Sequence, residues 1–230
     1  MRIYPILLST LLLTYPIFAQ TDEAEEEIID IQVSSQAELA DRNQAEQLNN
    51  QGNDLLASEQ YAAAEPLLRR AIKLDSTSVV YYENLARALG GQQDYEAVAS
   101  VYAQAQPQFP NNADLYYYQG DALQKLERYE EARAAYDRAI AVDQQHPGTQ
   151  LLHLYYFNRG NTHLKERNYE AARQDYDRAL EVNDFHYASY ANRGFARYNL
   201  KDKEGACTDW HKAKEAGYEM AQTYLSKYCP

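Results

Sequence analysis

The sequence predicts an all-α protein, a solenoid of five stacked helical hairpins with one capping helix at its C-terminal end. The main observation is an internal period, because repeats of about 20–50 residues are typical of solenoids. A small residue recurs at a spacing of 34, with one step of 40: Gly52, Ala86, Gly120, Gly160 and Gly194. Apolar residues make up 45% of the 230-residue chain, which is enough to bury a core between such units.

Large side chains recur at fixed places in each unit. Counted so that the small residue is position 8, two positions carry mostly aromatic residues: Leu48, Tyr82, Tyr116, Tyr156 and Tyr190 at position 4, and Leu68, Tyr102, Tyr136, Tyr176 and Trp210 at position 24. Positions 4, 8 and 11 share one face of a first helix, and positions 20, 24 and 27 share one face of a second. The predicted hairpins span residues 45–78, 79–112, 113–146, 153–186 and 187–220, and each must stack on its neighbours.

This pattern resembles the tetratricopeptide repeat family. The fourth unit carries it most completely, with Tyr156, Gly160, Tyr169-Glu170-Ala171-Ala172, Tyr176 and Ala179. The resemblance covers residues 45–220 and implies a right-handed α-α superhelix over residues 45–230, with the first helices lining a concave groove. Departures from the pattern are Lys203 in a tyrosine column and His163 and Arg197 at position 11.

Two segments modify the regular array. Six extra residues, 147–152, precede the fourth unit, and Pro147 suits the first turn of a helix. We therefore expect a longer first helix in that unit, with an interdomain hinge as the alternative. Gly217 ends a helix, and residues 218–228 are predicted to form the capping helix.

The two cysteines are predicted to form a disulfide. Cys207 lies near the start of the last hairpin's second helix, and Cys229 lies near the end of the cap. If the cap folds back antiparallel on that helix, the two thiols meet. The alternative is two separate thiols, one of them buried as a small hydrophobe.

The first 19 residues have the form of a secretory signal peptide. Met1 and Arg2 precede an apolar run, and Ala19 provides a small residue for cleavage. The alternative is a retained anchor, but the run is shorter than the ~20 apolar residues that span a bilayer. The chain is therefore identified as an exported, bacterial-type member of the family, periplasmic or outer-membrane-associated, with no membrane span after cleavage.

Residues 20–44 are strongly acidic. They contain eight Asp and Glu against Arg42 alone. Because like charges repel, we expect an extended, disordered tail, either a solvated spacer or a tether for a basic partner. The whole chain carries a formal net charge of −12, which argues against nucleic-acid binding.

No enzyme motif is present in the sequence. It has no Gly-rich phosphate loop, no His-Glu-x-x-His and no Gly-x-Ser-x-Gly, and its five histidines lack metal-ligand spacing. We therefore predict no catalytic residue, no metal site and no cofactor.

The family resemblance implies a partner-binding groove along the first helices. The predicted groove residues are Asn49, Asn53, Asn84, Arg87, Tyr117, Tyr118, Phe157, Asn158, Asn161, Asn192, Phe195 and Tyr198. Asparagine occupies position 6 in four units, and its amide can bind the backbone of an extended peptide. Four aromatic residues are expected to form an exposed patch at the C-terminal half of the groove: Tyr117, Phe157, Phe195 and Tyr198.

These features predict a non-enzymatic adaptor or scaffold of the cell envelope that binds a protein or an extended peptide segment. Asn49, Asp114 and Tyr118 stand where the family's carboxylate clamp carries cations, so recognition of a C-terminal carboxylate is not expected. Two alternatives remain. One is a self-assembling structural protein, a homo-oligomer, and the other is an accessory subunit of an envelope enzyme or of a secretion or assembly complex.

Overall fold

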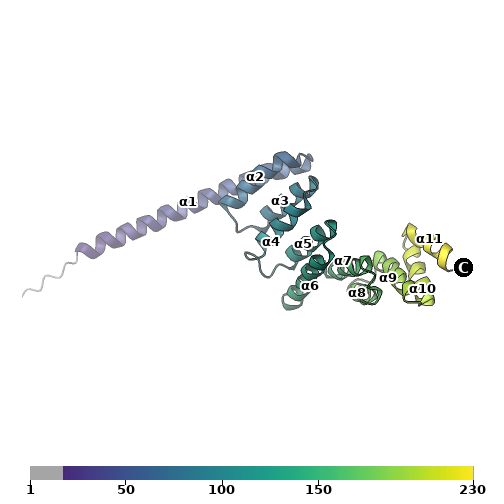
Figure 1. The fold of residues 1–230 in the computed structure, drawn as a ribbon. Helices are drawn as coiled ribbons and strands as arrows, with labels where there is room; N and C mark the ends of the chain where they lie inside the picture. Colours follow the sequence, from purple (N-terminus) through teal and green to yellow (C-terminus); the bar gives the residue numbers. More distant parts are fainter. Residues whose placement is uncertain (1–17, 230) are drawn as a thin grey trace, which may run out of the picture. The chain divides into compact units, whose positions relative to one another are not determined.

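A computed structural model describes residues 18–229, so the predicted signal peptide lies almost wholly outside the described residues. All regular elements within this range are helices, which confirms the all-α fold (Figure 1). They are α1 (Phe18–Ala57), α2 (Tyr61–Leu74), α3 (Val79–Gly91), α4 (Tyr95–Ala105), α5 (Ala113–Lys125), α6 (Tyr129–Gln145), α7 (Leu152–Lys165), α8 (Tyr169–Val182), α9 (Tyr187–Asn199), α10 (Lys203–Glu215) and α11 (Glu219–Tyr228). None of the helices within residues 18–229 is long and apolar enough to cross a membrane.

The acidic segment 20–44 is helical rather than extended. The segment lies in α1. The contacts within the chain divide the chain into two compact units, residues 1–44 and residues 45–230. Ala, Glu and Gln are frequent in this part of α1, and neither Gly nor Pro occurs before Gly52. These residues have high helix propensity, which here outweighs the mutual repulsion of the carboxylates.

The second unit consists of five hairpins and a cap. Residues 45–57 of α1 pair with α2, and the other pairs are α3 with α4, α5 with α6, α7 with α8 and α9 with α10 (Figure 1). The small residue at position 8 allows each pair to approach closely. A Cβ atom added to Gly120 would lie 2.6 Å from the Tyr136 ring, and one added to Gly194 would lie 2.6 Å from the Trp210 indole.

The aromatic column at position 24 forms the core of the hairpins. Tyr136, Tyr176 and Trp210 are completely buried. The column at position 4 is less buried in the later units, where cationic side chains cover its rings. Arg159 lies over Tyr156 and Arg193 lies over Tyr190, with guanidinium carbons 5.5 and 5.2 Å from the ring centroids.

The six-residue insertion does not extend a helix, so that prediction was wrong. α7 begins at Leu152, and residues 147–151 form a loop. The Thr149 amide donates to Asp143 at 3.3 Å, and its hydroxyl donates to Asp114 at 3.0 Å. Such side-chain bonds compete with helical ones, and Gly148 further disfavours a helix. Leu151 and Leu152 pack against the core and hold the loop on the solenoid.

The C-terminal cap is present as predicted. α11 packs on α10, and Cys207 and Cys229 form a disulfide with a Cα–Cα distance of 5.8 Å. Trp210 packs against the rings of both Tyr224 and Tyr228, with centroids 5.3 and 5.7 Å away. The cap therefore covers the end of the hydrophobic core.

A candidate binding face along the first helices

The first helices of successive hairpins present one continuous series of side chains, which we call the A face. It consists of residues 45–57 of α1 together with α3, α5, α7 and α9. Hydrogen bonds join consecutive helices of this face. The Asn84 amide donates to Asn49 at 2.8 Å, and the Asn192 amide donates to Asn161 at 2.9 Å.

The position-6 asparagines were expected to have amides free to bind a peptide, but most of these amides donate to side chains of the neighbouring hairpin. Asn158 donates to Asp121 at 2.8 Å and to the Tyr117 hydroxyl at 3.2 Å. Asn49 and Asn84 are buried, with exposures of 7% and 9%. Three of the four position-6 amides, those of Asn84, Asn158 and Asn192, thus join neighbouring hairpins. Because position 6 recurs in each unit, similar bonds recur along the A face.

The predicted aromatic patch is divided. Tyr117 is only 6% exposed, with the Tyr118 and Tyr155 rings each 5.0 Å away, so its assignment as an exposed groove residue was wrong. It is buried among the rings of Tyr118, Tyr136 and Tyr155, and the Tyr155 hydroxyl donates to Asp114 of the same helix. The remaining members, Phe157, Phe195 and Tyr198, are partly exposed.

The three exposed rings have different neighbours. The Phe157 ring lies 4.6 Å from His186 and 5.8 Å from Tyr176. Phe195 and Tyr198 pack against the core of the last hairpin and the cap, where Tyr198 lies 4.5 Å from Tyr228. Each ring is half-buried and held by its neighbours, so it offers an apolar surface in a fixed orientation.

A cavity of about 350 Å³ opens on the A face between α3 and α5. Its lining residues are Glu83, Asn84, Ala86, Arg87, Tyr102, Asp114 and Tyr118. Burial raises the pKa of the Glu83 carboxyl, and the nearby Asp114 carboxylate raises it further. Tyr102 and Tyr118 stack with centroids 5.6 Å apart and an angle of 23° between their planes.

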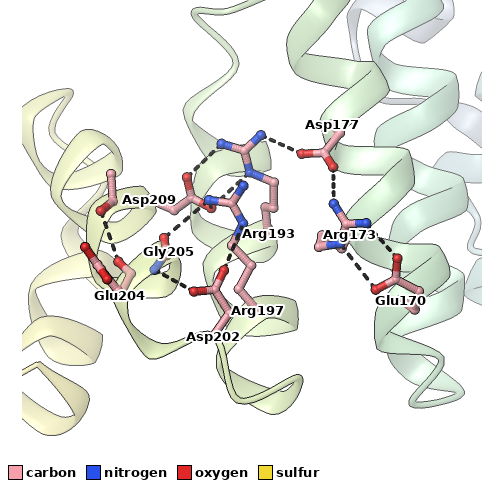
Figure 2. Close-up of polar contacts among 10 residues, drawn as sticks. Glu170, Arg173, Asp177, Arg193, Arg197, Asp202, Glu204, Gly205 and Asp209 are labelled. Atoms are coloured by element: carbon pink, nitrogen blue, oxygen red, sulfur yellow. Dashed lines mark hydrogen bonds and ion pairs between the residues drawn. The ribbon is translucent and has the colours of Figure 1, made fainter.

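A network of ion pairs fixes the last two hairpins, and sequence reasoning missed it. Figure 2 shows Arg193 of α9 between two carboxylates. It forms a bidentate pair with Asp209 at 2.7 and 2.9 Å, and its third nitrogen donates to Asp177 of the preceding hairpin at 2.7 Å. Arg197 also donates to Asp209, at 2.9 Å. Asp209 is 1% exposed, so this buried carboxylate is paired with two guanidinium groups.

The same arrangement occurs one hairpin earlier. Arg159 forms a bidentate pair with Asp175 and contacts Asp137 of the preceding hairpin at 2.6 Å. A signal for both networks is present in the sequence, where Asn-Arg-Gly recurs at 158–160 and 192–194 with an aspartate 16 residues after each arginine. The network leaves little unpaired charge there, so it supports the structure of the A face rather than offering a binding site.

Among the side chains that the structure describes, those of residues 35–229, no group of three or more His, Cys, Asp or Glu is placed to hold a metal ion. The A face instead offers half-exposed rings, amides and carboxylates on a rigid row of helices. Such groups can hold a peptide by hydrogen bonds, ring contacts and charge.

Paired helices stacked at a 34-residue period place this chain among the helical-repeat solenoids. Three models of the tetratricopeptide repeat family match it, over residues 49–113, 113–146 and 153–186. These matches cover more than half of the 230 residues, so the chain belongs to the tetratricopeptide repeat family.

A curated relative shares part of this repeat region. The small glutamine-rich tetratricopeptide repeat-containing protein 2 of Mycosarcoma maydis is 33% identical over 99 residues, which are 43% of this chain and 28% of that protein. The chain thus spans less than a third of that relative's length.

Solved structures share the fold at low sequence identity. MamA of Desulfovibrio magneticus is 18% identical with a TM-score of 0.65, and the match covers 78% of this chain and 97% of that one. YrrB, described as a TPR protein with an unusual peptide-binding site, is 20% identical with a TM-score of 0.62, covering 78% and 90%. PilF of Pseudomonas aeruginosa is 18% identical with a TM-score of 0.65, covering 77% and 78%.

Proposed function

We propose that this protein is a non-enzymatic adaptor that binds a segment of another protein along its A face. One observation carries the proposal: half-exposed side chains recur along successive first helices, each held in place by a neighbour. Tyr118 stacks on Tyr102, Phe157 packs on Tyr176, and Tyr198 packs on Tyr228. A surface fixed in advance loses little conformational freedom on binding, which favours affinity.

The site of action in this proposal is the cell envelope. The signal-like form of residues 1–19 supports export, and a structural disulfide is typical of proteins that work in oxidising compartments. The partner is accordingly an envelope protein or an exported peptide segment.

Affinity capture from envelope extract tests the proposal. The native chain is compared with a Tyr118→Ala/Phe157→Ala/Phe195→Ala variant. The matched control replaces three exposed apolar residues outside the A face: Val182, Phe185 and Met220, each by alanine. We expect a protein retained by the native chain and the control and lost by the A-face variant, with helicity unchanged by circular dichroism.

Equal retention by all three chains would contradict an A-face site. Light scattering of the purified chain then tests the main alternative, a self-assembling structural protein. A mass that rises with concentration would indicate self-assembly. If an enzymatic activity remains with the purified chain, the protein would instead be an accessory subunit of an envelope enzyme.

A further inference from the structure

The cavity between α3 and α5 is lined by a carboxylate, that of Glu83, which has no bonding partner among the described residues. Glu83 forms no hydrogen bond or ion pair with any of the residues that the structure describes, although it is half-buried on the A face. Arg87 lies one helical turn further along α3 but donates to Asn53. An acidic group so placed has been moved out of water without a compensating partner.

A second carboxylate faces the same cavity from the start of α5. Asp114 accepts from the Thr149 and Tyr155 hydroxyls through one oxygen, Oδ1. The other oxygen has no partner among the described residues. Repulsion from Asp114 adds to the burial that raises the pKa of Glu83, so the two negative charges lie close enough to disfavour each other. A bound cation would relieve this repulsion.

Two aromatic rings, Tyr102 and Tyr118, form part of the remaining wall, beside Asn84, Ala86 and Arg87. Tyr118 from α5 stacks on the buried Tyr102 from α4, which holds the Tyr118 ring at the edge of the cavity. The face of such a ring is electronegative and attracts a guanidinium or ammonium group. Two carboxylates that form no ion pair with the described residues, beside a fixed ring, therefore match a long side chain with an apolar stem and a cationic end.

We propose that this cavity binds a lysine or arginine side chain of the partner segment. The assignment rests on the proposed function, because it supposes that the segment lies along the A face. A cavity of about 350 Å³ accommodates one such side chain, with its stem against Tyr118 and its charge between Glu83 and Asp114. The chain's formal net charge of −12 favours the approach of a basic segment.

The test uses a probe that does not depend on identifying the partner. Nuclear magnetic resonance titration of the full chain with N-acetyl-arginine methylamide is compared with the citrulline analogue, which has the same shape without the charge. We expect saturable shifts at Glu83, Arg87 and Tyr118 with the arginine probe only. Glu83→Gln weakens that binding about tenfold, as expected for loss of a charge-assisted contact. Added salt also weakens it.

The matched control is Glu130→Gln. Glu130 is exposed on α6, outside the cavity, and its replacement changes the net charge by the same amount. We expect it to bind the arginine probe as the native chain does. Equal weakening in both variants would show a general charge effect and would overturn the assignment. So would equal binding of arginine and citrulline, or shifts confined to other helices.

The outcome is separable from that of the capture experiment. If A-face substitutions abolish capture but the arginine probe does not bind the cavity, the adaptor function stands and the basic-side-chain site is wrong. If the probe binds at Glu83 but no A-face partner is captured, the cavity is a cation site and the proposed adaptor function is wrong.

Discussion

At the scale of single residues, the buried aspartates of the last hairpins have the largest expected effect on stability. Asp209 is 1% exposed and is held by Arg193 and Arg197. Burying a carboxylate costs free energy unless cationic partners compensate its charge, and burying those cations likewise requires the carboxylate.

We expect Asp209→Asn to lower the free energy of unfolding by about 3–5 kcal/mol, because it leaves two guanidinium groups incompletely paired. Urea denaturation followed by circular dichroism measures the change. Glu181→Gln is the control, since its pair with Arg178 is largely exposed and contributes little to stability. A loss for Asp209→Asn no larger than that of the control would show that the network is not stabilising.

Three histidines of the fourth and fifth hairpins predict a dependence of stability on pH. Burial lowers the pKa of His153, His163 and His186 below the usual value, and the His153 ring lowers that of His186 further. Above the unfolded-state pKa of about 6.5, all three are neutral in both states. As the pH falls through that value the unfolded chain binds protons first, so stability decreases towards the lower folded-state pKa.

We therefore expect the free energy of unfolding to fall between pH 7 and pH 5, and His153→Phe to reduce that fall. The His153 ring lies 5.2 Å from His186, so its replacement removes one titrating group and one like charge. His211→Phe, at an exposed position on α10, serves as the control. Urea denaturation at each pH would contradict the account if the two variants showed the same slope. Carboxyl contributions cancel in this comparison.

At the scale of the elements, the position-8 glycines set the approach of each helix pair. We expect Gly120→Ala to destabilise the chain by about 1–3 kcal/mol, because the added Cβ meets the Tyr136 ring at 2.6 Å. Gly90→Ala, also inside a helix, has nothing nearer than Val98 at 4.0 Å and should stabilise it by about 0.5–1 kcal/mol. Thermal melts of both variants that moved in the same direction would contradict the close packing.

The disulfide makes the cap a separable element. α11 packs on α10, and the Cys207–Cys229 bond closes a loop with a sequence separation of 22. Reduction should lower the free energy of unfolding by about 3 kcal/mol, because the open chain gains more freedom when unfolded. Denaturation with and without reductant measures this, and a Cys207→Ser/Cys229→Ser variant should not respond to reductant. An identical response from that variant would show that the reductant acts elsewhere.

The helices and the disulfide could be predicted because they follow from a period and a register. Tyr136 and Trp210 fall at the same place in their units, and both are buried as the column requires. The loop at residues 147–151 was missed because it depends on bonds from Thr149 to Asp114 and Asp143, which are far from it in the sequence or not helical in spacing.

The candidate site was less predictable than the fold for a similar reason. The family pattern predicts on which side of a helix a groove residue lies. It does not predict which side chains of the neighbouring hairpins cover that residue or bond to it. Tyr117 was expected to be exposed, yet the rings of Tyr136 and Tyr155 from the next two helices cover it. Glu83 shares the cavity with Asp114 of the next hairpin, so its importance could only be seen once the hairpins were stacked.

At the scale of the whole molecule, site-specific photo-crosslinking can show whether a partner binds along the A face. A benzoylphenylalanine residue is placed at Tyr118 or Phe195 on the A face, and at Glu130 on α6 or Arg178 on α8, which are second helices of their hairpins. After illumination in envelope extract, mass spectrometry identifies the joined peptide. We expect adducts with one foreign protein segment from the A-face positions only. Adducts from the second-helix positions only, or adducts only with another copy of this chain, would contradict this expectation.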